Sequence, residues 1–301
     1  MPNSLAHYGI QIVTTRLAIP AADLRWACIG CVIPDLPWIG QRIASSLPFW
    51  DALSIRIYCI IQASLFFCLM LCFFLTLFSR TPSRVMAILS INVFLHLLLD
   101  ALQLKWANGV HFFAPVSWQM SGFQFVWPEH PLTYLLTAAG LVGIILVLLK
   151  YQTSPLFILP RTRPKQFAAI LVFGCYLLLP LFFFYGPKGA NNHYLATLID
   201  KDGRPGQYVE VDRANFETKT RTLTLFTGEK INLRGSLPDH NTTLSIQGVF
   251  VEPDSIRVVN HHVHQKLRNY FNYIGLVLLL LLICISFQPA KKHHNRPTPI
   301  A

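Results

Sequence analysis

The sequence predicts an α-helical integral membrane protein of about five spanning helices, with a small β-barrel inserted before the last helix. Three observations support this fold class. First, 53% of the 301 residues are hydrophobic and only 13% are charged, whereas soluble domains average about 25% charged residues. Second, apolar runs of bilayer-spanning length recur along the chain. Third, the polar segment 187–269 alternates with the period of β-strands. The composition excludes a simple soluble globule and a disordered chain.

The apolar runs place the spanning helices. A helix needs about 20 mainly apolar residues to cross the hydrocarbon core. Five stretches meet this requirement: 57–78, 85–102, 132–149, 167–185 and 270–287. Pro180 is expected to kink the fourth, because proline removes a helix hydrogen bond. The first 50 residues have shorter apolar stretches broken by prolines and arginines. We therefore expect one or two short N-terminal helices, partly embedded or packed against the others.

Basic residues in the short connections predict the orientation, because such residues stay on the cytoplasmic side. Segments 79–84, 150–166 and 288–301 carry lysine and arginine but no acidic residue. If these are cytoplasmic, the five helices alternate without conflict, and 103–131 and 187–269 face outward. We expect a multi-pass protein of the bacterial inner (plasma) membrane with its C-terminus in the cytoplasm. Most of the net charge of +11 then reflects this bias, so we expect no nucleic-acid partner.

The chain divides into four parts on this interpretation. Residues 1–150 form a helical membrane domain, and 151–186 hold a cytoplasmic loop and the fourth spanning helix. Residues 187–269 form an extracytoplasmic β domain, and 270–301 hold the last spanning helix and a basic tail. Candidate strands in the β domain are 194–199, 208–212, 220–226, 230–234, 244–250 and 255–259.

The β domain has two open interpretations. The end of the segment resembles the last strands of an OB-type barrel, a fold that binds oligonucleotides or oligosaccharides. The simpler interpretation is a stabilising or interaction domain that recruits a protein partner. Its 11 basic and nine acidic residues nearly balance, which gives no nucleic-acid signal. His261, His262 and His264, beside the last helix, suggest a metal site but equally fit a polar juxtamembrane segment.

One predicted spanning helix carries a cluster of polar residues. Asn92, His96 and Asp100 follow one another at intervals of four, so they share one face of the helix. Ionisable groups in a spanning segment are costly and are therefore functional candidates. A histidine and a carboxylate four residues apart can bind one metal ion. The alternatives are an interhelical hydrogen-bonded pair that holds the bundle together, or a proton relay.

Four sequence features together resemble those of a known protein family. They are His7 near the N-terminus, Asp35 between two prolines, the motif His-Leu-Leu-Leu-Asp at 96–100, and Asn-Gly-Val-His-Phe-Phe-Ala-Pro-Val-Ser-Trp at 108–118. Residues 1–150 thereby resemble the LexA-regulated, membrane-bound metal-dependent hydrolases (the DUF457 group), which are similar to zinc phospholipase C and P1-type nucleases. The resemblance implies that His7, Asp35, His96 and Asp100 are metal ligands. It also places His111 beside them or against the substrate.

The sequence departs from this family in one segment. Members of the family carry His-Arg-Gly-x-Thr-His-Ser between the Pro-Asp and the His-x-x-x-Asp motifs. Here no histidine lies between His7 and His96, and the segment reads Asp-Ala-Leu-Ser-Ile-Arg from Asp51. Asp51 could replace a ligand or act as the general base, and Arg56 could pair with a phosphate. The alternative is a degraded, inactive centre.

The resemblance implies a metal-dependent hydrolase. Mixed imidazole and carboxylate ligands suit Zn²⁺, which activates water and polarises a phosphoryl oxygen. Asp51, Arg56 and His111 are the catalytic candidates, and Lys105 could also neutralise substrate charge. Trp106, Trp118 and Trp127 fit an interfacial belt. This location predicts membrane lipid as a partner and a phosphoester or lipid-linked substrate at the outer face.

Two other functions remain open at this point. The first is a non-enzymatic membrane scaffold whose β domain recruits a partner, with the polar cluster holding the helices together. The second is a transporter that uses His96 and Asp100 as a proton relay. No inverted repeat or pair of broken helices is visible in the sequence, which argues against the transporter.

Overall fold

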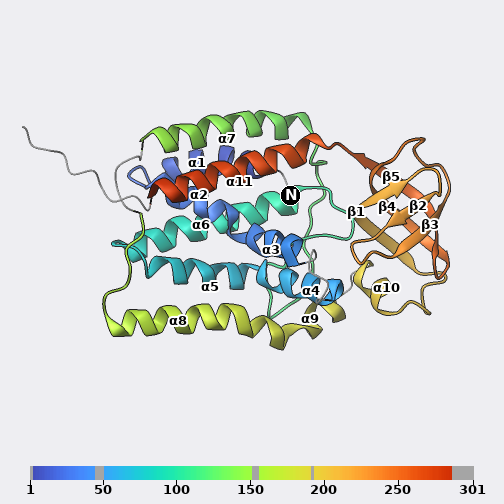
Figure 1. Cartoon of the computed structure of the whole chain (residues 1–301), viewed down its shortest axis with the longest axis horizontal. Coiled ribbons are helices and arrows are strands. Elements are labelled where there is room, and N and C mark those ends of the chain that lie inside the picture. The colour runs from blue at the N-terminus through green and yellow to red at the C-terminus, as the bar shows by residue number, and fades with distance from the viewer. Residues whose placement is uncertain (1–2, 45–50, 151–155, 191–192, 287–301) are drawn as a thin grey trace, which may run out of the picture.

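The computed structural model describes residues 3–44, 51–150, 156–190 and 193–286. The predicted basic tail therefore lies outside the described residues. Long helices lie side by side in a bundle, and a small β-sheet lies at one end of it (Figure 1). The expected combination of long apolar helices and a β segment is therefore present.

Among the described residues, four helical segments are long and apolar enough to cross a membrane. They are α6 (Pro82–Leu102), α7 (Pro131–Lys150), α11 (Leu267–Ser286) and the run Arg163–Gly189. That run contains α8 (Arg163–Leu178), a 3₁₀ turn (Leu179–Phe183) and α9 (Tyr185–Gly189). The turn contains Pro180, where the sequence predicts a kink.

Segment 57–78, predicted as one spanning helix, is broken in two, although the two parts together are long and apolar enough to form a fifth span. The segment consists of α4 (Ala52–Gln62) and α5 (Leu65–Thr76), which bend by 69° at the break between them. Ser64 has an extended backbone at the start of α5. Gln62 has partners at the break, because its Nε2 donates to Tyr58 Oη at 3.0 Å and to the Tyr176 carbonyl at 3.2 Å. The polar group at the bend is thus satisfied by α8.

The N-terminal region forms three short helices rather than one or two. They are α1 (Ser4–Ala18), α2 (Leu24–Val32) and α3 (Leu36–Ala44), with a 3₁₀ turn (Ile33–Asp35) before α3. Glycines allow α1 to lie against α7. A Cβ on Gly140 would lie 1.7 Å from the Leu5 carbonyl oxygen, and one on Gly9 would lie 2.3 Å from that of Leu136. Small residues at such crossings let helix backbones approach closely.

The described part of the β segment has five strands. They are β1 (Tyr208–Glu217), β2 (Thr222–Thr224), β3 (Lys230–Arg234), β4 (Thr242–Glu252) and β5 (Ser255–His264). Strands β3 and β5 are parallel, whereas the other neighbours are antiparallel. The order β1-β2-β3-β5-β4 closes on itself through the β1–β4 pairing. Alternate side chains such as Ile231 and Leu233 fill the interior.

One predicted strand, 194–199, is wrong, because these residues form the short helix α10 (Leu195–Ile199). Leu195 and Leu198 are buried, and Leu198 packs in the core of the sheet with Tyr194. Their spacing of three places them on one helical face. The short run of alternating residues was therefore compatible with either structure.

The connections lie at the two ends of the bundle (Figure 1). At one end, the Ala107 amide of the 103–130 segment donates to Glu210 of β1 at 2.7 Å. At the other end, the Ile158 amide donates to the Phe78 carbonyl at 2.8 Å, and the Leu156 amide to that of Ser286 at 3.1 Å. The sheet and the basic connections therefore lie at opposite ends.

Candidate metal centre

Two stripes of polar residues meet where α1 crosses α6. Both stripes have a spacing of four residues, which keeps each on one helical face. Asn92 Nδ2 donates to Thr15 Oγ1 at 2.8 Å, and His7 Nε2 lies 3.6 Å from Asp100 Oδ1. The members are His7, Gln11 and Thr15 on α1, and Asn92, His96 and Asp100 on α6. Gln11 and Thr15 were missed from the sequence, although their spacing from His7 is the same as that on α6.

The structure brings together three of the four residues that the resemblance implies as metal ligands, because ligand atoms of His7, His96 and Asp100 lie within 4.8 Å of one another, and it places the fourth, Asp35, beside His96. His96 Nε2 lies 3.6 Å from Asp35 Oδ1 and 3.8 Å from Asp100 Oδ2. The imidazole rings of His7 and His96 stack at 3.8 Å between centroids with an interplanar angle of 1°. Both histidines are fully buried. Asp35 reaches them from the 3₁₀ turn before α3.

Hydrogen bonds on the far side of each imidazole leave its Nε2 lone pair facing the centre. His96 Nδ1 lies in hydrogen-bond contact with the Cys31 carbonyl, so this nitrogen carries the proton. The Gln11 carboxamide lies 3.5 Å from His7 Nδ1. When its nitrogen donates to Asn92, its oxygen accepts from the His96 amide at 3.3 Å and lies beside His7 Nδ1. Polar partners at the nitrogen facing away from a metal orient histidines for metal binding.

The facing atoms fit a metal ion by distance and by chemistry. Among the described residues, His7 Nε2, His96 Nε2 and Asp35 Oδ1 are buried without a hydrogen-bond partner. An unpaired buried polar group costs about 1–3 kcal/mol, which an ion at this position would offset. The distances from His7 Nε2 to Asp100 Oδ1 and from His96 Nε2 to Asp35 Oδ1 are both 3.6 Å, compared with roughly 3.4 Å between ligand atoms around tetrahedral Zn²⁺.

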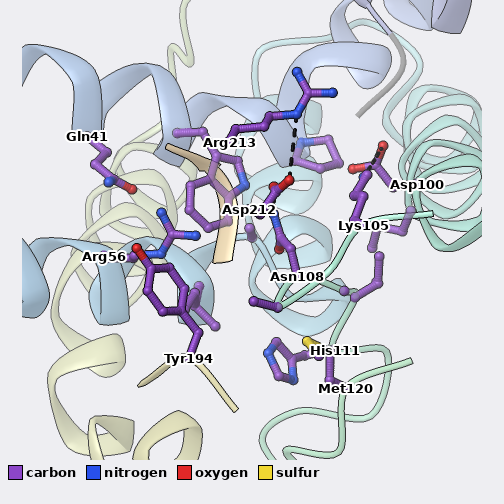
Figure 2. A pocket seen from close by; sticks show the side chains of 18 of the residues that line it. Gln41, Arg56, Asp100, Lys105, Asn108, His111, Met120, Tyr194, Asp212 and Arg213 are labelled. Atoms are coloured by element: carbon purple, nitrogen blue, oxygen red, sulfur yellow. Dashed lines mark hydrogen bonds and ion pairs between the residues drawn. The ribbon is translucent and has the colours of Figure 1, made fainter. Parts of the chain in front are cut away.

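Asp100 connects this centre to a cavity between the bundle and the sheet. Its Oδ1 lies 3.2 Å from Lys105 Nζ. The cavity has a volume of about 230 Å³ (Figure 2). Five basic residues line the described part of it: Arg42, Arg56, Lys105, Arg213 and Arg268. The only acidic residues among its described lining are Asp100 and Asp212. This excess of positive charge favours an anionic ligand.

Arg56 and His111, two predicted catalytic residues, both line this cavity. The Arg56 guanidinium lies over the Phe226 ring at 4.5 Å, and no ion pair to Arg56 is present among the described residues. His111 Nδ1 is buried without a hydrogen-bond partner in the same part of the chain. Burial lowers the pKa of His111, so its imidazole is neutral at neutral pH.

Asp51, the third predicted catalytic residue, lies apart from the cavity lining. It forms the N-cap of α4, where its Oδ2 accepts from the Ser54 amide at 2.8 Å. Hydrogen bonds from Ser54 lower the pKa of Asp51. The structure therefore gives Asp51 a helix-capping role and does not bring it to the centre as a replacement ligand.

A second group of potential ligands joins the 103–130 segment to the sheet. Glu129 Oε1 lies 2.9 Å from His264 Nδ1, and its Oε2 lies 3.3 Å from His262 Nε2. The three residues are close enough to bind a metal. These atoms already bond to one another, however, and Arg213 lies 3.8 Å from Glu129. The geometry favours a hydrogen-bonded clamp. Glu129 was missed from the sequence, although it is the single acidic residue of 103–131.

Comparison with known proteins yields no relative. No family model, curated protein or solved structure matches the chain. The function must therefore be argued from the geometry and chemistry of the site itself.

Proposed function

We propose that this protein is an integral membrane hydrolase that uses a divalent metal held by His7, Asp35, His96 and Asp100. The observation that carries the proposal is the convergence of unpartnered Nε2 and Oδ1 atoms beside a cationic cavity. The proposed substrate is a phosphoester, whose negative charge matches the cavity. The proposal agrees with the resemblance to the DUF457 hydrolases.

The ligand set suits Zn²⁺, because imidazole and carboxylate together bind this ion well. When bound, the ion supplies a polarised phosphoryl oxygen and an activated water. Arg56 and Lys105 bind and orient the anionic group, because guanidinium and ammonium groups both pair with phosphate. The neutral His111 imidazole accepts or donates a proton at the cavity wall.

The location of the protein is part of the same proposal. The long apolar helices and the basic segments at the end opposite the sheet support a multi-pass inner-membrane protein. In this orientation the sheet and the cavity lie on the outer side. The closed order β1-β2-β3-β5-β4, with its parallel β3–β5 pair, supports an OB-like barrel.

Metal content tests the proposed function directly. Wild-type protein purified in detergent should contain about one zinc per chain by mass spectrometry, and His96→Ala and Asp100→Ala should lose it. Phe94→Ala is the matched control, because Phe94 lies on α6 within one turn of His96 but has an exposed side chain. It should retain the metal.

Absence of metal from wild-type protein, even after reconstitution with zinc, would overturn the hydrolase. His96→Ala would then be expected only to lower thermal stability. That result would leave the alternative of a non-enzymatic scaffold, in which the polar cluster holds α1 against α6 and the sheet recruits a protein partner.

A further inference from the structure

We propose that the substrate is an amphiphile whose phosphoester head occupies the cationic cavity and whose hydrocarbon chain occupies an apolar groove on the other side of α3 and α4. This inference rests on the proposed function and names its substrate class. The cationic cavity and the apolar groove support it, because they are neighbours and share α3 and α4 as a wall.

The groove is the larger of the two sites, with a volume of about 700 Å³. This volume lies within the range of small-molecule sites. Most of its described lining is apolar and comes from α3, α4, α5 and the α8 segment. Leu36, Ile55, Leu177, Leu181 and Phe184 are among the lining residues. No charged residue is present among the described residues that line it.

The two sites share α3 as a wall. Trp38 and Arg42 of this helix face the cavity, whereas Leu36 and Gly40 face the groove. Gln41 lines both sites, so they meet at this residue. Figure 2 shows Gln41 at the edge of the cavity, across from Arg56.

Helix α4 forms the continuation of the same wall. Arg56 and Ile60 line the cavity, whereas Ile55, Tyr58 and Cys59 line the groove. One face of α4 therefore presents a cation to the cavity, and the other presents apolar side chains to the groove. A ligand that passes Gln41 meets positive charge at one end and hydrocarbon at the other.

Two polar side chains of the groove, Tyr58 and Gln62, are hydrogen-bonded within the protein, whereas Gln41 Oε1, where the groove adjoins the cavity, is buried without a partner in the described part of the chain. Tyr58 Oη donates to the Leu177 carbonyl at 2.8 Å, and Gln62 Nε2 donates to the Tyr176 carbonyl at 3.2 Å. A hydrocarbon chain in the groove therefore breaks no hydrogen bond and leaves no buried donor unpaired. A polar extension of the substrate would find few partners there, which favours an alkyl or isoprenyl chain.

Gly40 offers a way to fill the groove without disturbing the fold. It lies within α3, and a Cβ added there meets nothing within 4 Å. Gly40→Phe should therefore place a ring in the groove while the backbone stays in position. Gly174→Phe is the matched control, because Gly174 lies within α8, also has open space at Cβ, and is absent from the groove lining.

Photolabelling of the full-length protein in lipid nanodiscs tests the inference. The probe is a long-chain alkyl phosphate with a diazirine at mid-chain, and the comparison probe is the corresponding alcohol. Wild-type protein should be labelled on α3, α4 or α8 by the phosphate probe at least about tenfold more than by the alcohol. Tenfold corresponds to roughly one charge-assisted hydrogen bond to the head. Gly40→Phe should lose this labelling and Gly174→Phe should retain it.

Equal labelling by the alcohol would overturn the inference, because the groove would then hold ordinary bilayer lipid. Labelling of Gly40→Phe at the wild-type level would also overturn it. The readout requires neither metal nor turnover, so its failure is distinguishable from that of the hydrolase. Phosphate-dependent labelling without bound zinc would retain the amphiphile and reject the hydrolase. Bound zinc and hydrolysis of a water-soluble phosphoester, without labelling of the groove, would retain the hydrolase and reject the amphiphile.

Discussion

At the scale of single residues, Lys105 contacts Asp100, a proposed metal ligand, from the cavity in which the substrate would bind. Its Nζ lies 3.2 Å from Asp100 Oδ1, the oxygen that also lies 3.6 Å from His7 Nε2, and Lys105 lines the cavity. Lys105 thus contacts the substrate side of the centre and supplies no ligand atom, because its ammonium has no lone pair.

Lys105→Met should therefore raise KM for a phosphoester about tenfold or more while zinc remains bound. A hydrogen bond to a charged group contributes about 1.5–3 kcal/mol, and tenfold corresponds to about 1.4 kcal/mol. Steady-state kinetics and metal analysis of the same preparation provide the measurement. Loss of zinc in this variant would show instead that Lys105 maintains the metal ligands.

At the scale of elements, the position of α1 depends on its crossing with α7. A Cβ at Gly140 would lie 1.7 Å from the Leu5 carbonyl oxygen, which cannot move without the backbone of α1. A Cβ at Gly143, one turn away, would lie 3.2 Å from the end of the Ile12 side chain, which is flexible. The two glycines therefore form a matched pair.

Gly140→Ala should displace α1, and with it His7, whereas Gly143→Ala should be tolerated. Overpacking of this kind costs about 1–3 kcal/mol. The Gly140 variant should show a lower midpoint of thermal unfolding in detergent and reduced zinc content. Equal behaviour of the two variants would contradict the close α1–α7 contact.

The elements also show how much could be predicted from the sequence. Apolar runs of bilayer length predicted α6, α7 and α11 within a few residues, because hydrophobic length is a strong signal. The break between α4 and α5 was not predicted, because one of the two partners that satisfy Gln62 there is a carbonyl of α8, which is distant in the sequence. The candidate ligands on α6, His96 and Asp100, were visible through their spacing, whereas His7 on α1 was proposed only from the family resemblance. Arg213 and Asp212 of the cavity gave no such signal, because strand pairing and docking of the sheet bring them there.

At the scale of the whole molecule, the clamp around Glu129 joins the sheet to the helical part. His264 faces Glu129 through Nδ1, and its Nε2 lies 2.8 Å from Ser245 Oγ. Ser245 in turn donates to Asp212 at 2.9 Å, beside Arg213. His262 completes the set and stacks on Trp127 at 3.6 Å. The cavity lies at this junction, so its shape depends on the clamp.

Acid should loosen the junction. Burial lowers the pKa of His264 below 6.5, and the hydrogen bond to Glu129 only partly offsets this. A depressed histidine pKa means that the unfolded state binds the proton more readily, so this stability is lost as pH falls below about 6.5. Burial raises the pKa of Glu129, but hydrogen bonds from His262 and His264 outweigh it and hold that pKa well below 4.5. The contribution of the Glu129 carboxylate to the stability of the junction is lost at still lower pH.

Hydrogen exchange of the β5 amides, corrected for the intrinsic pH dependence, measures this loosening. Protection in wild-type protein should decrease from pH 7.5 to pH 5. Glu129→Gln should reduce protection already at pH 7.5, because the carboxamide cannot pair with both histidines and Arg213 as a carboxylate does. It should also flatten the dependence below pH 4.5, since the titrating carboxylate is absent. Protection that stays constant from pH 7.5 to pH 5 would show that protonation of His264 does not weaken the junction.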